Sequence, residues 1–395
     1  MKTKVQIAVA GAILLAAMAI GGTMQGAFGG DGGADNNSIL KHLKNISTVS
    51  STVPANGDVN PYGIARVQKT VGNLTRGHIL ISNFNNGSNA QGTGTTIVDV
   101  APDGTLGLFA QIDVGSLPGK CPGGLGLTTA LVVLRSGWVI VGSLPTSDGT
   151  SATAQAGCLI VLNSSGNPVE TISGGPINGP WDMAAAEDDQ EAKLFVTNVL
   201  NGTVAAGGSV VHQGTIVRVT LKFSTWDIPR VKEETVIASG FAQRTDPAAL
   251  VIGATGIALS GPCFENDGDD CVDFPQFDLG DVLYVADSLN NRVAVIGRPL
   301  DRMTSAGTGE TLTKGGSLNI PLGLIVAPNG NVLTVNGQDG FITEITPGGR
   351  QIAKELLDGT GGPPPGNGTL FGLIFVPGSG VYFVDDGSNS LNLLW

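Results

Sequence analysis

The sequence predicts an all-β fold, a six-bladed β-propeller built from four-stranded antiparallel blades. Short β-rich runs recur between clusters of Gly, Pro, Asn and Asp, and no long stretch past residue 55 carries apolar residues at helical spacing. A pattern of three such runs repeats six times along the chain. The 395 residues include 60 glycines without a G-X-Y period, which favours a turn-dense fold over collagen or a helical bundle.

The clearest repeat unit is residues 281–296, in which a polar turn joins two β-rich runs. Related pairs of runs lie at 78–83 with 96–100, 138–143 with 158–162, 194–198 with 214–219, 331–336 with 340–345, and 381–386 with 390–394. Each pair follows a third run that opens at a tight turn, at 61–65, 124–127, 180–184, 254–258, 321–325 and 370–374. A unit this short cannot bury both faces of its sheet alone. We therefore expect the units to stand side by side as blades rather than as linker-joined sandwich domains.

The two ends of the chain are expected to meet in the last blade. The last unit stops at Trp395 after three runs, and the β-branched segment 46–53 precedes the first unit without a partner of its own. Pairing of 46–53 with 390–394 would supply the missing strand and remove two exposed edges. The sequence therefore predicts a single propeller domain over residues 45–395.

The N-terminal residues have the order of a secretory signal. Lys2 and Lys4 precede an apolar stretch, 5–20, which small residues follow. A retained transmembrane anchor is the alternative, but the stretch is shorter than the roughly 20 residues that span a bilayer, and no basic cluster follows it. We expect a signal peptide over residues 1–27 and a flexible leader over 28–44. The chain is then secreted, with no stable membrane insertion after cleavage.

Export allows disulfides, and the chain has four cysteines, Cys121, Cys158, Cys263 and Cys271. The even number favours two bridges, and four cysteines allow three pairings. A short local loop between Cys263 and Cys271 leaves Cys121 with Cys158 as the preferred second pair. Zinc is the competing interpretation, but the sequence lacks the C-x-x-C-like pairs and nearby histidines that zinc sites use.

The formal charge of −12 restricts the class of partner. Nucleic acids and anionic membranes attract basic surfaces, which displace counterions or meet anionic lipid. We therefore expect no nucleic acid and no anionic membrane as a partner. A small molecule or an extracellular protein is the expected ligand.

Two segments resemble a known repeat. Residues 284–293, Tyr-Val-Ala-Asp-Ser-Leu-Asn-Asn-Arg-Val, resemble the NHL repeat, and 61–65, Pro-Tyr-Gly-Ile-Ala, is similar to its first strand. The resemblance is specific in the fourth unit and degenerate in the second and third. It implies a six-bladed propeller, a fold shared by binding scaffolds, streptogramin-lyase-like proteins and gluconolactonase-like hydrolases. Fold alone does not choose among these functions.

In a propeller the opening run of each unit lines the central channel, so the openers and the ends of the second runs should ring one mouth. The openers contribute Tyr62, Leu125, Trp181, Thr255, Leu322 and Phe371, and the second runs contribute Asn83, Ser143, Asn198, Asp287, Gly337 and Asp386. Aromatic surface with a few polar groups is typical of a small-molecule site. The candidate ligand-binding residues are Tyr62, Asn83, Trp181, Asn198, Asp287, Phe371 and Asp386. The alternative is that Asp287 and its equivalents cap the adjoining turns by accepting from backbone N–H groups.

The alternative function is a secreted lyase or metal-dependent lactonase-like hydrolase that uses the same mouth. A lactonase needs several oxygen ligands on one divalent metal, and only Asp182 places a carboxylate at an opener. A lyase needs a general base, usually His, with an acid beside it, and His212, in the connection after the second run of unit three, is the histidine that could approach the mouth. Asp182 and His212 are therefore the catalytic candidates. The sequence favours a binding scaffold over an enzyme. A purely structural surface protein is the third alternative, which closed propeller faces without an exposed aromatic mouth would favour.

The insertion 263–273, between the first and second runs of unit four, is rich in acidic residues. Asp267, Asp269 and Asp273 alternate as in a calcium loop, although the full EF-hand pattern with a closing bidentate Glu is lacking. Calcium is the one cofactor that the sequence suggests, and a solvated acidic loop closed by a disulfide is the alternative. A connection of this kind leaves the blade on the face opposite the mouth, so calcium there would be structural.

Overall fold

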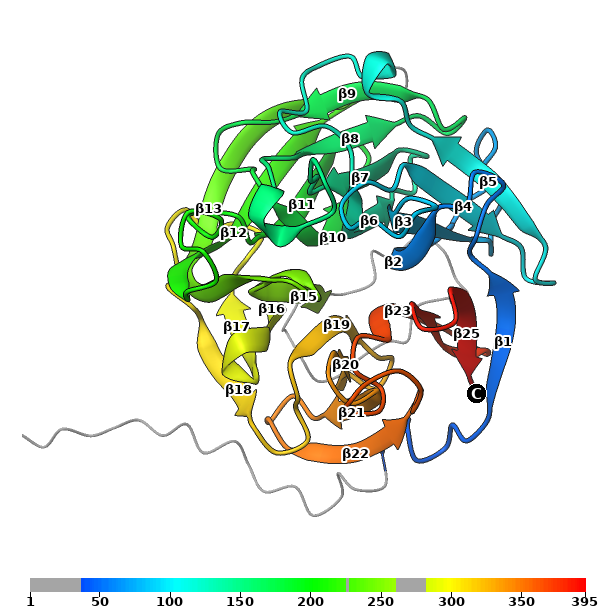
Figure 1. The fold of residues 1–395 in the computed structure, drawn as a ribbon, viewed down its shortest axis with the longest axis vertical. Helices are drawn as coiled ribbons and strands as arrows, with labels where there is room; N and C mark the ends of the chain where they lie inside the picture. The colour runs from blue at the N-terminus through cyan, green and yellow to red at the C-terminus, as the bar shows by residue number, and fades with distance from the viewer. Residues whose placement is uncertain (1–36, 225–226, 261–281) are drawn as a thin grey trace, which may run out of the picture. The chain divides into compact units, whose positions relative to one another are not determined.

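A computed structural model of the chain describes residues 37–224, 227–260 and 282–395. Its strands form six antiparallel sheets, which stand around a common axis as the blades of a propeller (Figure 1). The predicted all-β fold is thereby confirmed. The first strand of each blade is innermost, since the first strands of neighbouring blades contact one another around the axis. No helix in these three ranges is long and apolar enough to cross a membrane.

The strands follow the chain from blade to blade. Blade 1 contains β2 (Val59–Arg66), β3 (Ile79–Asn85), β4 (Thr96–Val100) and β5 (Leu106–Gln111). Blade 2 contains β6 (Leu127–Val133), β7 (Val139–Ser143), β8 (Cys158–Leu162) and β9 (Pro168–Ile172). Blade 3 contains β10 (Pro180–Glu187), β11 (Glu191–Asn198), β12 (Val211–Lys222), β13 (Arg230–Asp246) and β14 (Leu250–Ile252). Blade 4 contains β15 (Ala254–Ser260), β16 (Val282–Asp287), β17 (Arg292–Gly297) and β18 (Glu310–Lys314). Blade 5 contains β19 (Pro321–Val326), β20 (Val332–Asn336), β21 (Phe341–Ile345) and β22 (Gln351–Leu356). Blade 6 contains β23 (Leu370–Val376), β24 (Gly380–Asp385), β25 (Ser390–Leu394) and β1 (Ile46–Ser51).

The two ends of the chain close blade 6, as the sequence predicts. β1 pairs antiparallel with β25, from Ile46 opposite Leu394 to Ser51 opposite Ser390. Figure 1 shows β1 beside β25 and the C-terminus. The strand nearest the N-terminus therefore covers an edge of β25 that would otherwise expose unpaired backbone groups.

The segment before β1 is tied to blade 5. Glu344 of β21 is 0% exposed, and its carboxylate accepts a hydrogen bond from the Ser38 hydroxyl at 2.6 Å. The N–H groups of Ile39 and Leu40 each donate to the same carboxylate at 3.0 Å. Part of the segment expected to be a flexible leader is thus in contact with the propeller.

Neighbouring blades approach most closely at one position of the innermost strands. A Cβ added at Gly323 would lie 2.0 Å from the Phe371 carbonyl oxygen of the next blade, and one at Gly256 would lie 2.0 Å from the Leu322 carbonyl oxygen. The pairing with the second strands makes the following residues equivalent: Gly63, Ala130, Asp182, Gly256, Gly323 and Gly372. The glycines of the predicted openers of blades 1, 4, 5 and 6 are required there because the next blade occupies the space of a side chain.

Two of the predicted ring positions are displaced by one residue. The residue that ends the second strand opposite the start of the first is Asn83 in blade 1, Asn336 in blade 5 and Asp385 in blade 6. The sequence instead assigned Gly337 and Asp386 to the ring. A shift of one residue moves a side chain to the other face of its strand, so the assigned residues have different surroundings from Asn83.

The predicted opener of blade 2 is displaced further. β6 begins at Leu127, and its pairing with β7 is irregular between Leu127 and Leu131. Thr129 therefore occupies the position of Tyr62, and Leu125 belongs to the connection before the blade. The irregular pairing, a β-bulge, adds residues that the regular repeat did not predict.

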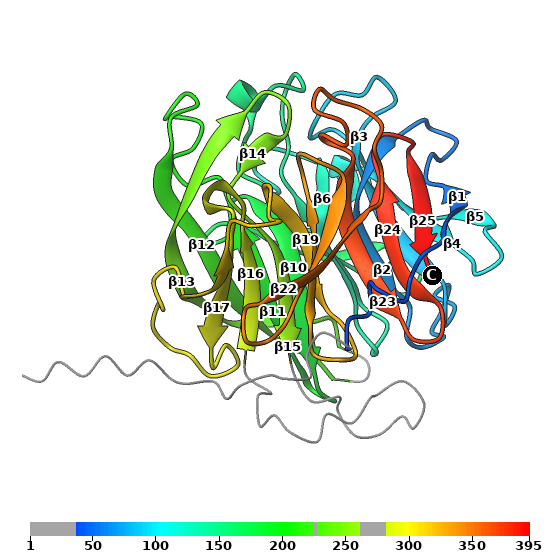
Figure 2. The same cartoon turned by 90° about the horizontal axis from the view of Figure 1, so that it is seen from below.

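Blade 3 departs from the predicted four strands. β13 is 17 residues long, and β14 folds back on it from Leu250 opposite Asp246 to Ile252 opposite Arg244. Figure 2 shows β14 at one end of this blade. Leu250 has a positive φ of 59° and is 1% exposed. A bulky residue in this conformation is held there by its packing, so β14 is fixed by burial of Leu250.

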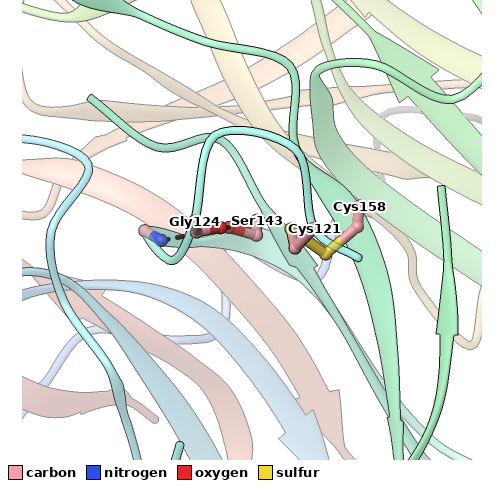
Figure 3. The surroundings of a disulfide bond; sticks show 5 residues. Cys121, Gly124, Ser143 and Cys158 are labelled. Atoms are coloured by element: carbon pink, nitrogen blue, oxygen red, sulfur yellow. Dashed lines mark hydrogen bonds between the residues drawn. A yellow bond between two sulfur atoms is a disulfide. The ribbon is translucent and has the colours of Figure 1, made fainter. Parts of the chain in front are cut away.

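The preferred disulfide is present. Cys121, in the connection before β6, is bonded to Cys158 at the start of β8 (Figure 3). Beside the bridge, the Ser143 hydroxyl donates a hydrogen bond to the Gly124 carbonyl oxygen at 3.0 Å. The connection is therefore fixed to blade 2 at two points. Cys263 and Cys271 lie outside the described residues, so their pairing stays a prediction.

Replacing Cys121 and Cys158 together with serine is expected to lower the free energy of unfolding by at least about 2 kcal/mol, because the bridge restricts the unfolded chain. Denaturant unfolding of the variant and the parent protein measures the difference. Ser143→Ala is the control, since it keeps the bridge but removes the two hydrogen bonds of this hydroxyl, to the Gly124 carbonyl oxygen and from the Gly126 N–H, at a cost of about 1 to 2 kcal/mol. Equal stability of the parent and the double variant would contradict a stabilising bridge.

Candidate functional site

Three aromatic side chains meet at the end of the channel where the innermost strands begin, which we call the mouth. Tyr62, Trp181 and Phe371 hold equivalent positions in blades 1, 3 and 6. The Tyr62 ring is stacked on Phe371 with the centroids 3.9 Å apart, and it lies 6.2 Å from the Trp181 ring. Phe84 of β3 stacks on Tyr62 at 4.5 Å. These four residues form the aromatic cluster, which brings the predicted aromatic residues of the mouth together.

Connections between strands cover the aromatic cluster. Tyr62, Trp181 and Phe371 are 4%, 5% and 6% exposed. Leu144, from a connection of blade 2, and Leu250, from β14, belong to the same hydrophobic core as these rings. The rings therefore form a packed floor beneath the connections, whereas the sequence suggested an open lining.

Hydrogen bonds join the covering connections to one another. The side chain of Gln91, between β3 and β4, donates to the Pro247 carbonyl oxygen between β13 and β14 at 3.1 Å. The Thr146 hydroxyl of blade 2 donates to the Gln91 carbonyl oxygen at 2.6 Å. The connections of blades 1, 2 and 3 are thus linked at the mouth.

Two of the predicted polar residues fix the chain as it enters a blade. Asn198 Oδ1 accepts hydrogen bonds from the N–H groups of Asn178 and Gly179 at 3.2 and 3.3 Å. Asn83 Nδ2 donates to the Thr52 carbonyl oxygen at 3.0 Å. Asn198 therefore has the turn-capping role that the sequence left open as the alternative. Asn83 instead donates, and it ties the chain that follows β1 to blade 1.

Asp287 is 0% exposed and is neutralised within its own hairpin. Arg292 contacts the carboxylate through Nε at 3.0 Å and Nη2 at 2.8 Å. Asn290 Nδ2 donates to both carboxylate oxygens at 3.0 Å. A buried carboxylate with these partners stabilises the turn between β16 and β17, and breaking the pair would leave a buried charge.

Asp386 differs from the other polar residues at the mouth. It is half-buried, and no described residue donates a hydrogen bond to its carboxylate. Burial, and then the charge of Asp385, raise the pKa of Asp386 to about 7. Burial, and then the charge of Asp386, raise the pKa of Tyr62 far above its usual value. Asp386 therefore lies within electrostatic reach of the Tyr62 hydroxyl, at the edge of the aromatic cluster.

Asp182 takes the place in blade 3 that glycine takes in four other blades. The side chain is half-buried, and its carboxylate accepts hydrogen bonds from the N–H groups of Met183 at 2.8 Å and Ile257 at 3.1 Å. Ile257 belongs to blade 4, so Asp182 bridges two innermost strands. Burial raises the pKa of Asp182 to about 7, although these two hydrogen bonds lower it.

The second catalytic candidate is separated from the first. The sequence placed His212 in a connection, but β12 begins at Val211, so His212 lies on a strand, and its side chain is exposed. β11 stands between β12 and β10, the strand of Asp182. His78 lies beside β3, where its Nδ1 is 3.0 Å from Asp99. The structure therefore does not place Asp182 and His212 on adjacent strands.

No group of three His, Cys, Asp or Glu side chains in the described part of the chain is arranged to hold a metal ion. The calcium candidates Asp267, Asp269 and Asp273 lie outside that part. Calcium at the acidic insertion therefore stays a prediction.

A cavity of about 580 Å³ lies beside the connection between blades 1 and 2. It is lined by Thr95, Gln111, Ile112, Asp113, Val114 and Leu125. None of these residues belongs to the aromatic cluster. Leu125, which the sequence assigned to the mouth, thus lines a different part of the surface.

The site can now be compared with known proteins. No protein-family model matches the chain, and no curated protein matches its sequence. Among solved structures, regucalcin from Agrobacterium tumefaciens, described as a calcium-binding protein, is 11% identical and has a TM-score of 0.51, over 88% of this chain and 93% of that one. The likeness is one of fold.

Two further structures belong to the classes that the NHL-like repeat implied. A gluconolactonase from Xanthomonas campestris is 11% identical, with a TM-score of 0.49 over 88% of each chain. A catalytically inactive virginiamycin B lyase from Staphylococcus aureus, determined with quinupristin, is 16% identical, with a TM-score of 0.46 over 88% of this chain and 84% of that one. The structural neighbours are thus six-bladed propellers. The function of this chain has to be argued from its own residues.

Proposed function

We propose that the chain is an exported, non-enzymatic propeller that binds a small molecule at the mouth. The observation that carries the proposal is the meeting of Tyr62, Trp181 and Phe371 beside Asp386. These rings supply an apolar floor, and the Asp386 carboxylate, to which no described residue donates a hydrogen bond, supplies orientation. Side chains from three blades would then hold one ligand.

Closing the ring of blades does not by itself require these aromatic residues. In blades 4 and 5 the equivalents of Tyr62 are Thr255 and Leu322, which are 0% and 7% exposed. A small polar or an aliphatic side chain therefore fits the same position of an innermost strand. The choice of Tyr, Trp and Phe in blades 1, 3 and 6 supports a role beyond packing.

Export is proposed from the signal-like N-terminus and agrees with the bridge between Cys121 and Cys158, since disulfides persist in oxidising compartments. A secreted lyase or lactonase-like hydrolase would use the same face. Its candidates are less well supported, because His212 is exposed on the third strand of blade 3 and both oxygens of Asp182 accept from backbone groups.

The chain contains four tryptophans, of which Trp181 lies in the aromatic cluster and Trp395 is 52% exposed at the C-terminus. In protein labelled with fluorotryptophan, a ligand of the mouth is expected to shift the fluorine resonance of Trp181, because the ring would contact the ligand. The resonance is assigned with Trp181→Phe, and a library of cationic, anionic and neutral metabolite-sized compounds supplies the ligands. Trp395 is the internal control. Small-molecule binding at the mouth is wrong if no compound shifts Trp181, or if hits shift Trp395 alone.

A further inference from the structure

Building on this proposed site, we propose that its ligand carries a primary ammonium group. The group binds at the junction of blades 6 and 1, between the Asp386 carboxylate and the Asn60 amide oxygen, beside the Tyr62 hydroxyl. Asp386 follows directly after β24, and Asn60 lies near the start of β2.

Asn60 presents a buried acceptor that lacks a donor. Its side chain is 5% exposed, and Oδ1 has no hydrogen-bond partner among the described residues. The backbone N–H of Asn60 donates to Asn389 Oδ1 at 2.7 Å, and the N–H of Asn389 donates to the Asp386 carbonyl oxygen at 3.3 Å. Burial raises the pKa of Tyr62 and a hydrogen bond from the Asn60 side chain lowers it, so the Asn60 amide nitrogen faces the Tyr62 hydroxyl oxygen. A buried carbonyl oxygen without a donor is unfavourable, so a donor from a ligand would stabilise the site.

A second amide oxygen in the same strand pair is also without a donor. Asn85, which pairs with Val59 next to Asn60, is 2% exposed, and its Oδ1 has no partner among the described residues. Its Nδ2 donates to Asn89 Oδ1 at 2.6 Å, which fixes the orientation of the amide. Blade 1 thus contains two buried amide oxygens, those of Asn60 and Asn85, that lack a donor among the described residues.

The charge around Asp386 is negative. Burial, and then the charge of Asp358, raise the pKa of Asp385, and Asp385 in turn acts on Asp386. A Cβ added at Gly387 would lie 3.2 Å from Asp385 Oδ1 and 3.4 Å from Asp358 Oδ2, so these two carboxylates face the same small space. No ion pair of the described residues joins a Lys, Arg or His to any of the three. The local charge therefore attracts a cation and repels an anion.

A primary ammonium group matches this set of acceptors. It has three N–H donors, and the Asp386 carboxylate, Asn60 Oδ1 and the Tyr62 hydroxyl oxygen can each accept one. Both faces of the Tyr62 ring are occupied, one by Phe371 and the other by Phe84, so the ring can offer only its edge to the carbon atoms attached to the nitrogen.

A divalent metal ion would also use oxygen ligands, but the carboxylates of Asp385 and Asp358 already accept hydrogen bonds from nearby backbone N–H groups. Asp385 Oδ1 accepts from the Ser388 N–H at 3.2 Å, and Asp358 Oδ1 accepts from the Thr360 N–H at 2.8 Å. Asp386 is thus the carboxylate left for an incoming group. A single carboxylate with amide oxygens is a poor metal site and a suitable ammonium site.

The test compares benzylammonium with benzyl alcohol, which has nearly the same shape and no charge. The chain has three tyrosines, so fluorotyrosine labelling gives a resonance for Tyr62 that Tyr62→Phe assigns. Titration at about pH 8 is expected to show binding of benzylammonium about tenfold or more tighter than of the alcohol. Asp386→Asn should remove that preference and leave benzyl alcohol unaffected. Asp148→Asn, which removes a charge from an exposed loop of blade 2, is the matched control and should keep the preference.

The pH dependence gives a second readout that needs no variant. Benzylammonium keeps its charge between about pH 5.5 and pH 8, whereas Asp386, with its pKa raised to about 7, loses a proton over this interval. Asp385 and Asp358 are the other carboxylates that face this region. Affinity for benzylammonium should therefore rise with pH, and affinity for benzyl alcohol should stay constant.

The outcomes separate this inference from the proposed function. If both probes shift Tyr62 equally, if benzoate binds better than benzylammonium, or if calcium chloride displaces benzylammonium, the ammonium assignment is wrong while a mouth site remains. If no probe shifts either Tyr62 or Trp181, both proposals are wrong. An unchanged preference in Asp386→Asn would overturn the assignment of that residue.

Discussion

Replacing Glu344 with alanine is expected to lower the free energy of unfolding by about 3 to 5 kcal/mol. The carboxylate is fully buried and accepts hydrogen bonds from Ser38, Ile39 and Leu40. Asn331 Nδ2 donates to it at 2.6 Å and Asn329 Nδ2 at 3.2 Å. Alanine would leave these donors unpaired in the interior and would release the segment that leads into β1. Denaturant unfolding measures the loss.

Glu355 provides the matched control. It also connects blade 5 to the N-terminal segment, through an ion pair with Lys44 at 3.2 Å, but the two side chains are 33% and 57% exposed. An exposed pair contributes little, so Glu355→Ala should cost less than about 1 kcal/mol. Comparable losses for Glu344→Ala and Glu355→Ala would contradict the view that the buried carboxylate anchors the segment.

The pH dependence of stability has a definite sign at Glu344. Burial raises the pKa of Glu344, but the hydrogen bonds from Ser38, Asn331 and the N–H groups of Leu40 and Ile39 outweigh burial and hold it below its usual value. The contribution of a carboxylate with a lowered pKa is complete above its unfolded pKa and is lost as the pH falls. The parent protein should therefore lose more stability than Glu344→Ala between about pH 5 and pH 3.

The fold could be predicted because its signals are local and repeated. In four blades the opener passes so close to the next blade that glycine is selected, and each pair of β-rich runs is joined by a turn. The unpaired segment 46–53 and the incomplete last unit predicted the closing pair of strands. The register of the strands was harder to predict. A bulge in β6 and shifts of one residue in blades 5 and 6 leave the pattern of β-rich runs and turns unchanged, so the repeat does not reveal them.

The site was predicted only in part. Tyr62, Trp181 and Phe371 come together because they occupy one repeated position, and a repeat is visible in the sequence. Their burial depends on connections such as β14, which the repeat does not contain. Glu344 was missed for a similar reason. In the sequence it is one polar residue within a β-rich run, and Ser38, whose hydroxyl donates to it, lies 306 positions away along the chain.

Replacing Gly323 with alanine is expected to lower the free energy of unfolding by about 3 kcal/mol, because the added methyl group requires two innermost strands to separate. Its Cβ would lie 2.0 Å from the Phe371 carbonyl oxygen and 2.8 Å from Leu373 Cδ2. The carbonyl belongs to the backbone of blade 6, which cannot rotate away as a long side chain would. The shift would also displace Phe371, so the aromatic cluster should loosen. Denaturant unfolding and the Trp181 fluorine resonance measure both effects.

Asp182→Gly is the reciprocal change, and it should cost much less. It gives blade 3 the residue found at this position in blades 1, 4, 5 and 6, and it removes the bridge to Ile257. A carboxyl group whose pKa is raised to about 7 on folding stabilises the folded state below its unfolded pKa, and this contribution is lost as the pH rises toward about 7. Asp182→Gly should therefore be less stable than the parent at about pH 5 and closer to it at about pH 8. A larger loss of stability at pH 8 than at pH 5 would show that the contact between blades 3 and 4 needs the charged carboxylate. A loss as large as that of Gly323→Ala would show that this position packs differently in blade 3 from its glycine equivalents.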